Sequence, residues 1–169
     1  MFIEAKETRV LIGDDHAVVR AGLRAVIDQQ PSFVVVDEAQ DIPALVLAVG
    51  HQLPDMVVMD LATQETSSLD AITDIKRRHP DTRILMLTGN RSRDYVVGSL
   101  HAGANGYVLK ENSIPEFLTA LSCVRKGQTY LCPEIAEFVI SAYFHQKPEI
   151  FLDATSTTLS LRETQVLKL

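Results

Sequence analysis

Two neighbouring carboxylates follow a hydrophobic run near the start of the chain, in the stretch LIGDDHAVVRAG. Asp14 and Asp15 carry like charges, and groups that close do not ionise together easily unless a cation compensates them. Two explanations are open: the pair caps a helix that follows, or it holds a hard divalent cation such as Mg²⁺, which prefers oxygen ligands. His16, next to the pair, fits a surface histidine in a first helical turn better than a metal ligand.

Three more polar residues end hydrophobic runs further along the chain: Asp60 in VVMDL, Thr88 in LMLTG and Lys110 in GYVLK. A carboxylate can act as a nucleophile toward phosphorus, and phosphoryl transfer needs little beyond positioning and charge neutralisation. Thr88 could donate a hydrogen bond to a phosphoryl group, and Lys110 could pair with it. Each residue alone has an ordinary explanation as a turn, a strand filler or a solvated charge, so the case for one site depends on their shared position.

The hydrophobic runs alternate with helical patterns. Five runs rich in Val, Ile and Leu are nearly continuous, which is typical of strands buried on both faces of a parallel sheet. We predict strands at Arg9–Gly13, Phe33–Ala39, Met56–Asp60, Arg83–Thr88 and Gly106–Lys110. We predict helices between and after them, over about 16–29, 43–52, 68–79, 91–102 and 114–127.

This alternation predicts an α/β fold, a doubly wound, five-stranded parallel sheet with helices on both faces. In the flavodoxin-like strand order 2-1-3-4-5, the first and third strands are neighbours, and ligands bind at the carboxyl ends of the strands. The five polar residues would then meet in one crevice: Asp14, Asp15, Asp60, Thr88 and Lys110. A Mg²⁺ ion there would compensate the three carboxylates.

The composition bounds the class of protein. The chain of 169 residues suffices for one domain of ordinary size plus a tail, and 46% of its residues are hydrophobic, which argues against general disorder. A formal charge of −6 argues against nucleic-acid binding by this chain alone. Cys123 and Cys132 lack a metal-ligand spacing, so a reducing, cytoplasmic setting is the simplest interpretation. The sequence contains no apolar signal segment and no run of membrane-spanning length.

The alternation of strands and helices ends near residue 127. Beyond it we predict a connection, a further helix and a linker, at Tyr130–Pro133, Glu134–His145 and Gln146–Thr158. The last residues, LSLRETQVLKL, restart a helical pattern, and Ser160 with Glu163 fits a capping box at its start.

Together these motifs resemble a two-component response regulator. The matching elements are DD after the first strand, D in VVMDL, T in LMLTG and K in GANGYVLK. GANGYVLK and GQTYLCPEIAE resemble the NarL/FixJ (LuxR-type) branch, and LSLRETQVLKL resembles the first helix of that branch's helix-turn-helix domain. The resemblance implies a CheY-like receiver domain at 8–128, a linker with one helix at 129–158 and the truncated start of a DNA-binding domain at 159–169.

The resemblance also implies a role for each matching residue. Asp60 would accept a phosphoryl group from a sensor histidine kinase. Asp14 and Asp15 would organise Mg²⁺ together with Asp60 and the main-chain carbonyl of Ala62. The protein would catalyse only its own phosphorylation and dephosphorylation, and would not be an enzyme in any other sense.

Lys110 and Thr88 would contact the phosphoryl oxygens, and Thr88 with Tyr107 would form the switch pair of the family. In the family, this switch controls homodimerisation and frees the DNA-binding domain. The recognition helix of such a domain is not in this chain, so the resemblance implies DNA binding only through the missing C-terminal domain, and no membrane partner. The helix over 91–102, with Tyr95, Val96 and Leu100, is one candidate dimer face, and the first and fifth helices are also candidates.

The sequence departs from the family pattern after Asp60, where LATQETSS at Leu61–Ser68 replaces a loop with Met-Pro-Gly and Asp-Gly. We expect this loop, Thr63–Ser68 above all, to alter the phosphorylation rate or the metal affinity. One alternative is therefore a phosphate-independent (atypical) receiver that acts as a protein–protein interaction module. Another is an Asp-nucleophile phosphohydrolase, but Ala62 stands two residues after Asp60 and leaves no general acid.

Overall fold

The computed structural model describes residues 6–61 and 65–144 of the chain. By contacts the chain divides into two compact units, Met1–Ile135 and Ala136–Leu169. The predicted linker at 146–158, the predicted helix start at 159–169 and Ala62 lie outside the described residues. The fold described below is that of the first unit.

The first unit is built on one parallel sheet of six strands in the order β2-β1-β3-β4-β5-β6. The strands are β1 (Thr8–Asp14), β2 (Phe33–Ala39), β3 (Met56–Asp60), β4 (Arg83–Thr88), β5 (Gly106–Leu109) and β6 (Tyr130–Leu131). The predicted order 2-1-3-4-5 is confirmed, and β2, β3 and β4 have the predicted bounds. The predicted count of five strands is wrong by one, because a sixth strand joins the edge.

The sixth strand lies where the sequence predicts a connection. The Tyr130 N–H donates to the Asn105 carbonyl at 3.3 Å, and the Cys132 N–H donates to the Tyr107 carbonyl at 3.1 Å. Gly106 permits this close approach, because a Cβ at that position would lie 3.2 Å from the Tyr130 carbonyl oxygen. Two residues are too few to show the hydrophobic period of a strand, so the pairing became visible only in three dimensions.

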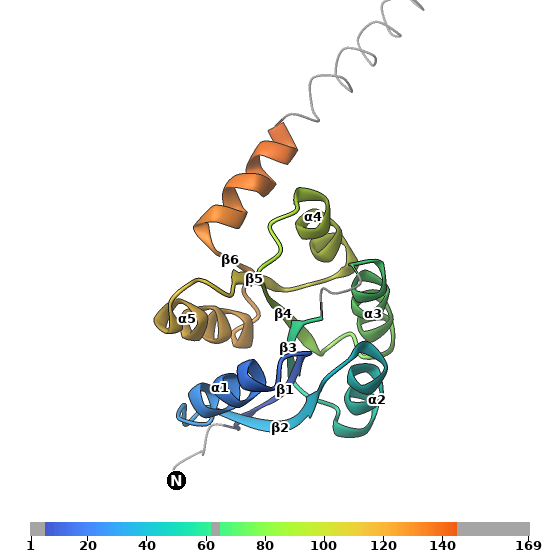
Figure 1. Ribbon diagram of the computed structural model, residues 1–169, viewed down its shortest axis with the longest axis vertical. Helices are drawn as coiled ribbons and strands as arrows, with labels where there is room; N and C mark the ends of the chain where they lie inside the picture. The colour runs from blue at the N-terminus through green and yellow to red at the C-terminus, as the bar shows by residue number, and fades with distance from the viewer. Residues whose placement is uncertain (1–5, 62–64, 145–169) are drawn as a thin grey trace, which may run out of the picture. The chain divides into compact units, whose positions relative to one another are not determined.

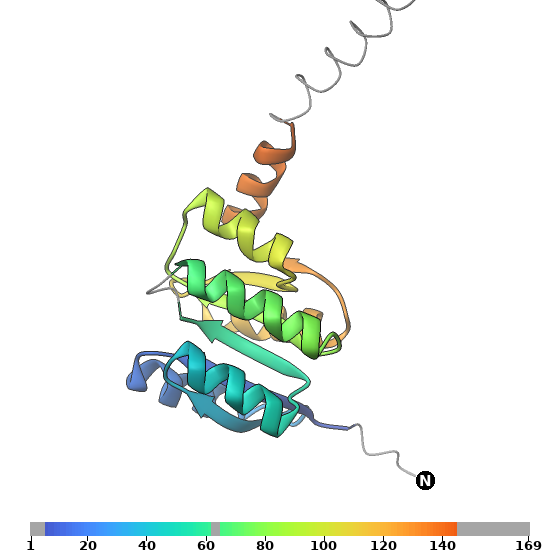
Figure 2. The same ribbon diagram turned by 90° about the vertical axis from the view of Figure 1, so that its right-hand side faces the viewer.

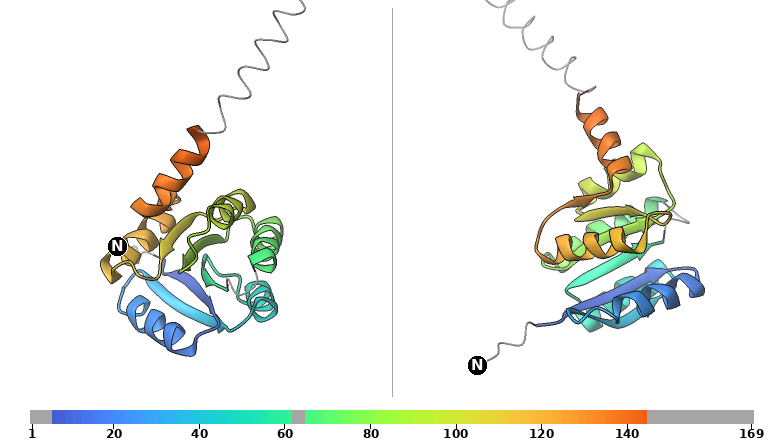
Figure 3. Two further views of the ribbon diagram at one scale, coloured as in Figure 1. Left: turned by 45° about the horizontal axis from the view of Figure 1, so that its top comes forward. Right: turned by 90° about the vertical axis from the view of Figure 1, so that its left-hand side faces the viewer.

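Helices cover both faces of the sheet (Figure 1). They are α1 (Ala17–Ile27), α2 (Ile42–Gln52), α3 (Glu65–Arg78), α4 (Arg93–Ala102) and α5 (Ile114–Arg125). The helices α2, α3 and α4 lie side by side on one face (Figure 2), and α1 and α5 lie on the other (Figure 3, right). This is the doubly wound arrangement that the alternation of strands and helices predicts.

Local sequence signals begin two of these helices. Asp41 precedes α2 and accepts a hydrogen bond from the Ala44 N–H at 2.8 Å, while Ser113 precedes α5 and accepts one from the Glu116 N–H at 3.4 Å. Both α2 and α5 have a proline in the first turn, where no intrahelical hydrogen-bond donor is lost. α4 begins at Arg93, two residues later than predicted.

The hydrophobic core has a layer on each side of the sheet, because successive strand residues point to opposite faces. One layer joins alternate residues of the strands to α1 and α5, among them Val10, Val58, Leu85, Val108 and Phe117.

Tyr95 and Val96 of α4 are also buried. The prediction that these two residues form part of a dimer face is therefore wrong, since both pack α4 onto the domain, while Leu100 of the same predicted face is half-buried.

A further helix runs over residues 133–144, which confirms the helix predicted at Glu134–His145 as far as the described residues extend. None of the helices in the described part of the chain is both long enough and apolar enough to cross a membrane.

Candidate functional site

The polar residues singled out in the sequence lie at the carboxyl ends of neighbouring strands. Asp14 ends β1 and is the register partner of Asp60, which ends β3. Thr88 ends β4, and Lys110 follows β5 directly. The Lys110 N–H donates to the Thr88 carbonyl at 3.1 Å, which ties these two strand ends together. The structure therefore brings together the residues that the sequence predicts for one crevice.

Lys110 links two of the carboxylates. Its Nζ lies 2.8 Å from Oδ2 of Asp14 and forms a second, short ion pair with Oδ2 of Asp60. Burial by itself lowers the pKa of this ammonium group, but the hydrogen bonds with Asp14 and Asp60 outweigh burial and raise the pKa above its ordinary value. The side chain is thus held charged at neutral pH, and it neutralises part of the acidic cluster.

The turn after β1 presents the two neighbouring carboxylates differently. The Asp14 side chain is buried, and its Oδ1 accepts a hydrogen bond from the His16 N–H at 2.7 Å. The Asp15 side chain is 34% exposed, and its Oδ1 lies 2.6 Å from Nδ1 of His16. The N-cap of α1 is His16, which makes no side-chain capping hydrogen bond. Neither aspartate occupies the capping position, so the capping alternative is wrong.

The donor atoms in this crevice fit a hard divalent cation. Asp14, Asp15 and His16 offer ligand atoms within 4.8 Å of one another. Asp60 lies at the end of the neighbouring strand β3, opposite Asp14. Mg²⁺ takes one or two carboxylates together with water molecules and phosphate oxygens. The half-exposed Asp15 leaves the cluster open to solvent on one side, so an ion and its waters can enter.

Thr88 and Tyr107 are connected through the loop after β4. Oγ1 of Thr88 accepts a hydrogen bond from the Asn90 N–H at 3.1 Å, and the Tyr107 hydroxyl donates to the Asn90 carbonyl at 2.9 Å. Both Thr88 and Tyr107 are buried. The buried Tyr107 side chain therefore fixes the loop that follows Thr88.

Two residues outside the predicted set also shape the crevice. Asn90 binds both Thr88 and Tyr107 through its main chain, and its Oδ1 also accepts a hydrogen bond from the Ser92 N–H at 2.8 Å. Its signal in the sequence is an asparagine two residues after a strand, a position that favours a side-chain-bonded turn. Arg20 donates from Nη1 to the Asp14 carbonyl at 2.7 Å. No local pattern signals this contact.

The departure from the family pattern lies beside the crevice. Residues 62–64 are outside the described part of the chain, so the predicted ligand Ala62 cannot be placed. At the far end of this segment the buried Ser68 hydroxyl donates to the Leu61 carbonyl at 2.5 Å. That bond joins the first turns of α3 to the end of β3.

Known proteins share both the sequence pattern and the fold. Residues 10–122 match the response regulator receiver domain. The oxygen regulatory protein NreC of Staphylococcus carnosus (strain TM300) is 34% identical over 168 residues, covering 95% of this chain and 76% of that protein. A crystal structure of a LuxR-family two-component response regulator from Aurantimonas sp. SI85-9A1 superposes with a TM-score of 0.76 at 29% identity, covering 82% of this chain and 99% of that chain.

The isolated receiver domain of RcsB from Salmonella enterica serovar Typhimurium, determined with the phosphomimetic BeF₃⁻, superposes with a TM-score of 0.72 at 26% identity. It covers 79% of this chain and 99% of that chain. The parallel sheet with acidic residues and a lysine at its carboxyl edge defines a receiver domain, and the chain belongs to the response regulator receiver family. Within that family it is a two-component response regulator of the NarL/FixJ (LuxR) type, a class of transcription regulators.

Proposed function

We propose that Asp60 accepts a phosphoryl group from a sensor histidine kinase in a Mg²⁺-dependent reaction in the cytoplasm. The phosphorylated domain would then dimerise and control a DNA-binding domain of which residues 159–169 resemble the first helix. The receiver would span 8–128 and the linker 129–158. The observation that carries this proposal is the pairing of Lys110 with Asp14 and Asp60 at the carboxyl ends of β1 and β3.

The geometry gives each side chain a task. Asp60, with 12% of its side chain exposed, presents a carboxylate oxygen that can bond to phosphorus while the bond from phosphorus to the donor's leaving atom breaks. Lys110 is already held at this carboxylate and would pair with a phosphoryl oxygen. The Thr88 hydroxyl ends the neighbouring strand and would donate to a second phosphoryl oxygen, at the expense of its bond from the Asn90 N–H.

The acidic turn would hold the metal ion. Asp14, Asp15, Asp60 and the Ala62 carbonyl are the proposed ligands. Bound Mg²⁺ would supply positive charge next to the transferring phosphoryl group. Lys110 pairs with two of the three carboxylates, and Arg20 is already paired with Glu38. The three carboxylates therefore leave an excess of negative charge that would otherwise repel a phosphodonor.

The switch would use the loop between β4 and α4. The Tyr107 hydroxyl donates to the Asn90 carbonyl, and the Thr88 hydroxyl accepts from the Asn90 N–H. If Thr88 turns toward a phosphoryl group, the loop loses one of these two anchors and can take a second arrangement. Thr88 and Tyr107 would thus convert a local charge change into a changed surface at α4 and β5.

An apolar groove next to the site fits a protein phosphodonor. It has a volume of about 300 Å³ and lies between α1 and α5, with Leu23, Lys110 and Phe117 among its lining residues. Val18 and Ile114 are large exposed hydrophobic residues of the same two helices. A kinase that covers this surface would bring its phosphohistidine to Asp60 from the side on which Lys110 lies.

The test is the intact mass of the protein after incubation with acetyl phosphate and Mg²⁺. The wild type and an Asp55→Asn control are expected to gain one phosphoryl group, and Asp60→Asn is expected to gain none. Asp55 is a matched control because it stands at the opposite end of the same strand, where Oδ2 accepts the Arg9 N–H at 2.9 Å. Labelling of Asp60→Asn at the wild-type level would overturn the assignment of Asp60.

The departure at Leu61–Ser68 favours one second candidate, a phosphate-independent receiver that acts as an interaction module. In that case the wild type would neither gain mass nor bind BeF₃⁻, the phosphomimetic that the RcsB receiver structure contains. Sustained turnover of a phosphomonoester would instead support the phosphohydrolase alternative. Labelling that stops at one phosphoryl group excludes both.

A further inference from the structure

We propose that Arg20 is a positioning residue that fixes the Asp14–Asp15 turn for metal binding. This inference rests on the proposed function, because it concerns the Mg²⁺ affinity of the acidic turn. It starts from one contact: Nη1 of Arg20, on α1, donates a hydrogen bond of 2.7 Å to the main-chain carbonyl of Asp14.

The bonded carbonyl belongs to the peptide unit that joins the two acidic residues. A peptide unit is planar, so holding the Asp14 carbonyl oxygen sets the directions in which the chain leaves the Cα atoms of Asp14 and Asp15. Both side chains start from those atoms. Arg20 therefore acts on both carboxylates without touching either of them.

The ordinary means of fixing a helix start is absent at α1. Its N-cap, His16, makes no side-chain capping bond, and its first turn contains no acidic residue. Arg20 instead binds the turn twice, since its main-chain N–H donates to the His16 carbonyl at 3.1 Å and its side chain reaches Asp14. Without the side-chain bond, the turn would keep the first helical hydrogen bonds and the contacts of His16 with Asp14 and Asp15, and it would lose the bond from Arg20 to the Asp14 carbonyl.

The far side of the guanidinium group is anchored in the sheet. Nε of Arg20 lies 3.4 Å from Oε2 of Glu38 on β2, and 16% of the Arg20 side chain is exposed. Strand pairing places Glu38 opposite Ile12 on β1. A charge with so little access to water requires partners, and Glu38 and the Asp14 carbonyl supply them. Arg20 thus connects β2 to the acidic turn at the end of β1.

A positioning role and a purely electrostatic role of Arg20 predict opposite effects of its substitution on metal affinity. If Arg20 acted only through its positive charge, Arg20→Gln would reduce repulsion of a dication and tighten metal binding, while Arg20→Lys would change nothing. If Arg20 positions the turn, both variants weaken binding, because one ammonium group cannot reproduce the planar fork of donors of a guanidinium group. The direction of the change therefore separates the two roles.

Arg24 provides a matched control on the same helix. Its Nε donates to Oε1 of Glu38 at 2.5 Å, so it shares the carboxylate that anchors Arg20. Its other bonded partners among the described residues are Val35 and Asp28, and none of its contacts reaches the acidic turn. Arg24→Gln thus removes an arginine from the same network and leaves the Asp14 carbonyl bonded.

The experiment counts bound Mn²⁺ by electron paramagnetic resonance, since Mn²⁺ takes the same oxygen ligands as Mg²⁺. We expect the dissociation constant to rise about tenfold in Arg20→Gln and by a smaller factor in Arg20→Lys, as for other residues that orient metal ligands. Arg24→Gln should stay within about twofold of the wild type by the same comparison. The rate of phosphorylation by acetyl phosphate at saturating Mg²⁺ should remain near that of the wild type in Arg24→Gln, none of whose contacts reaches the acidic turn.

Three results would contradict the inference. Arg20→Gln could bind Mn²⁺ as tightly as the wild type or more tightly, which would leave only a charge effect. Arg24→Gln could weaken binding as much as Arg20→Gln, which would make the effect one of helix stability. If Arg20→Gln does not fold by circular dichroism, unchanged binding in Arg20→Lys overturns the inference. A wild type that binds no Mn²⁺ would refute the proposed function itself.

Discussion

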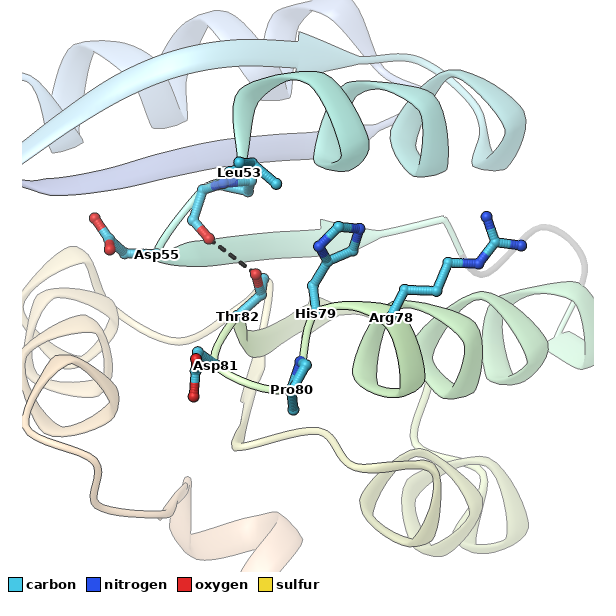
Figure 4. Close-up of a pocket in the computed structure, with 8 residues that line it drawn as sticks. Leu53, Asp55, Arg78, His79, Pro80, Asp81 and Thr82 are labelled. Atoms are coloured by element: carbon cyan, nitrogen blue, oxygen red, sulfur yellow. Dashed lines mark hydrogen bonds between the residues drawn. The ribbon is translucent and has the colours of Figure 1, made fainter.

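The two ends of the sheet carry the same residue types and use them differently. At the carboxyl end of β3, Asp60 meets Asp14 and Lys110 in an open crevice. At the amino end of the same strand, Asp55 accepts the Arg9 N–H and pairs with Lys6. A pocket of about 300 Å³ also lies at this end (Figure 4). A pocket with charged residues is therefore present at both ends, and only the contacts tell them apart.

The two lysines show the difference most clearly. Lys76, near the amino end, donates from Nζ to the carbonyls of Pro80 and Thr82 at 2.9 and 2.8 Å. Burial lowers its pKa, and the attraction of Asp81 only partly opposes this. Lys110 pairs with carboxylates, and its pKa is raised. Lys76 holds a loop in place, whereas Lys110 neutralises charge that a ligand can take over.

The threonines at the two ends of β4 show the same contrast. Thr82, just before the strand, donates to the Pro54 carbonyl at 2.9 Å, the bond drawn in Figure 4. Thr88, at the other end, accepts from the Asn90 N–H in a loop. At the amino end, Thr82 and Lys76 bind main-chain carbonyls of neighbouring turns. At the carboxyl end, Thr88 also binds a main-chain group, but Lys110 and the carboxylates bind one another, so this end can change when a ligand arrives.

The largest effect is expected from exchanging each lysine for methionine. Lys110→Met should slow phosphorylation by acetyl phosphate about 100-fold, because the proposed positive partner of the phosphoryl oxygens is lost. It should also lower the free energy of unfolding without Mg²⁺, and added Mg²⁺ should restore it, because the ion replaces the missing charge.

Lys76→Met is the matched control for this change. It should lower the free energy of unfolding by about 1–2 kcal/mol, because two carbonyls lose their donor, and Mg²⁺ should not restore it. Phosphorylation rates by intact mass and urea unfolding measure both effects. Equal loss of phosphorylation in the two variants would abolish the functional distinction between the two ends of the sheet.

A smaller effect is expected from replacing each threonine with valine, which keeps the shape and removes the hydroxyl. Thr88→Val should slow phosphorylation about tenfold, the equivalent of one hydrogen bond. Thr82→Val should leave the rate unchanged and cost about 1 kcal/mol of stability, because the buried Pro54 carbonyl loses its donor. A slower rate in Thr82→Val with no stability loss would contradict the comparison.

The smallest expected effect is on the pH dependence of stability. The pKa of Lys110 is raised in the folded state, so its stabilising effect is complete below the ordinary value of 10.5 and is lost as pH rises through the folded pKa. The pKa of Lys76 is lowered, so its charge costs stability at neutral pH, and the cost disappears as pH approaches 10.5.

Urea unfolding from about pH 9 to 11.5 tests this difference, because both lysines titrate near that range. The stability difference between the wild type and Lys110→Met should shrink as pH rises above 10.5. The stability difference between the wild type and Lys76→Met should grow as pH rises toward 10.5. Parallel curves for the two variants would show that the two lysines do not differ in environment.

The sequence by itself determined which segments form strands and which residues end them. Continuous runs of Val, Ile and Leu identify strands buried on both faces, and parallel strands bring their carboxyl ends to one edge. The sequence therefore predicts that Asp14, Asp60, Thr88 and Lys110 lie together. Helix starts were less certain, as at α4, where the Asn90 side chain binds the Ser92 N–H and delays the helix to Arg93.

Only the tertiary structure decided which side chains touch. The bond from Arg20 to the Asp14 carbonyl, the pairing of β6 with β5 and the bonds of Asn90 with Thr88 and Tyr107 leave no periodic pattern in the sequence. Each depends on the direction of a side chain or on a strand partner distant along the chain, and packing fixes both. The sequence thus located the acidic crevice, and the fold selected the residues that hold it in shape.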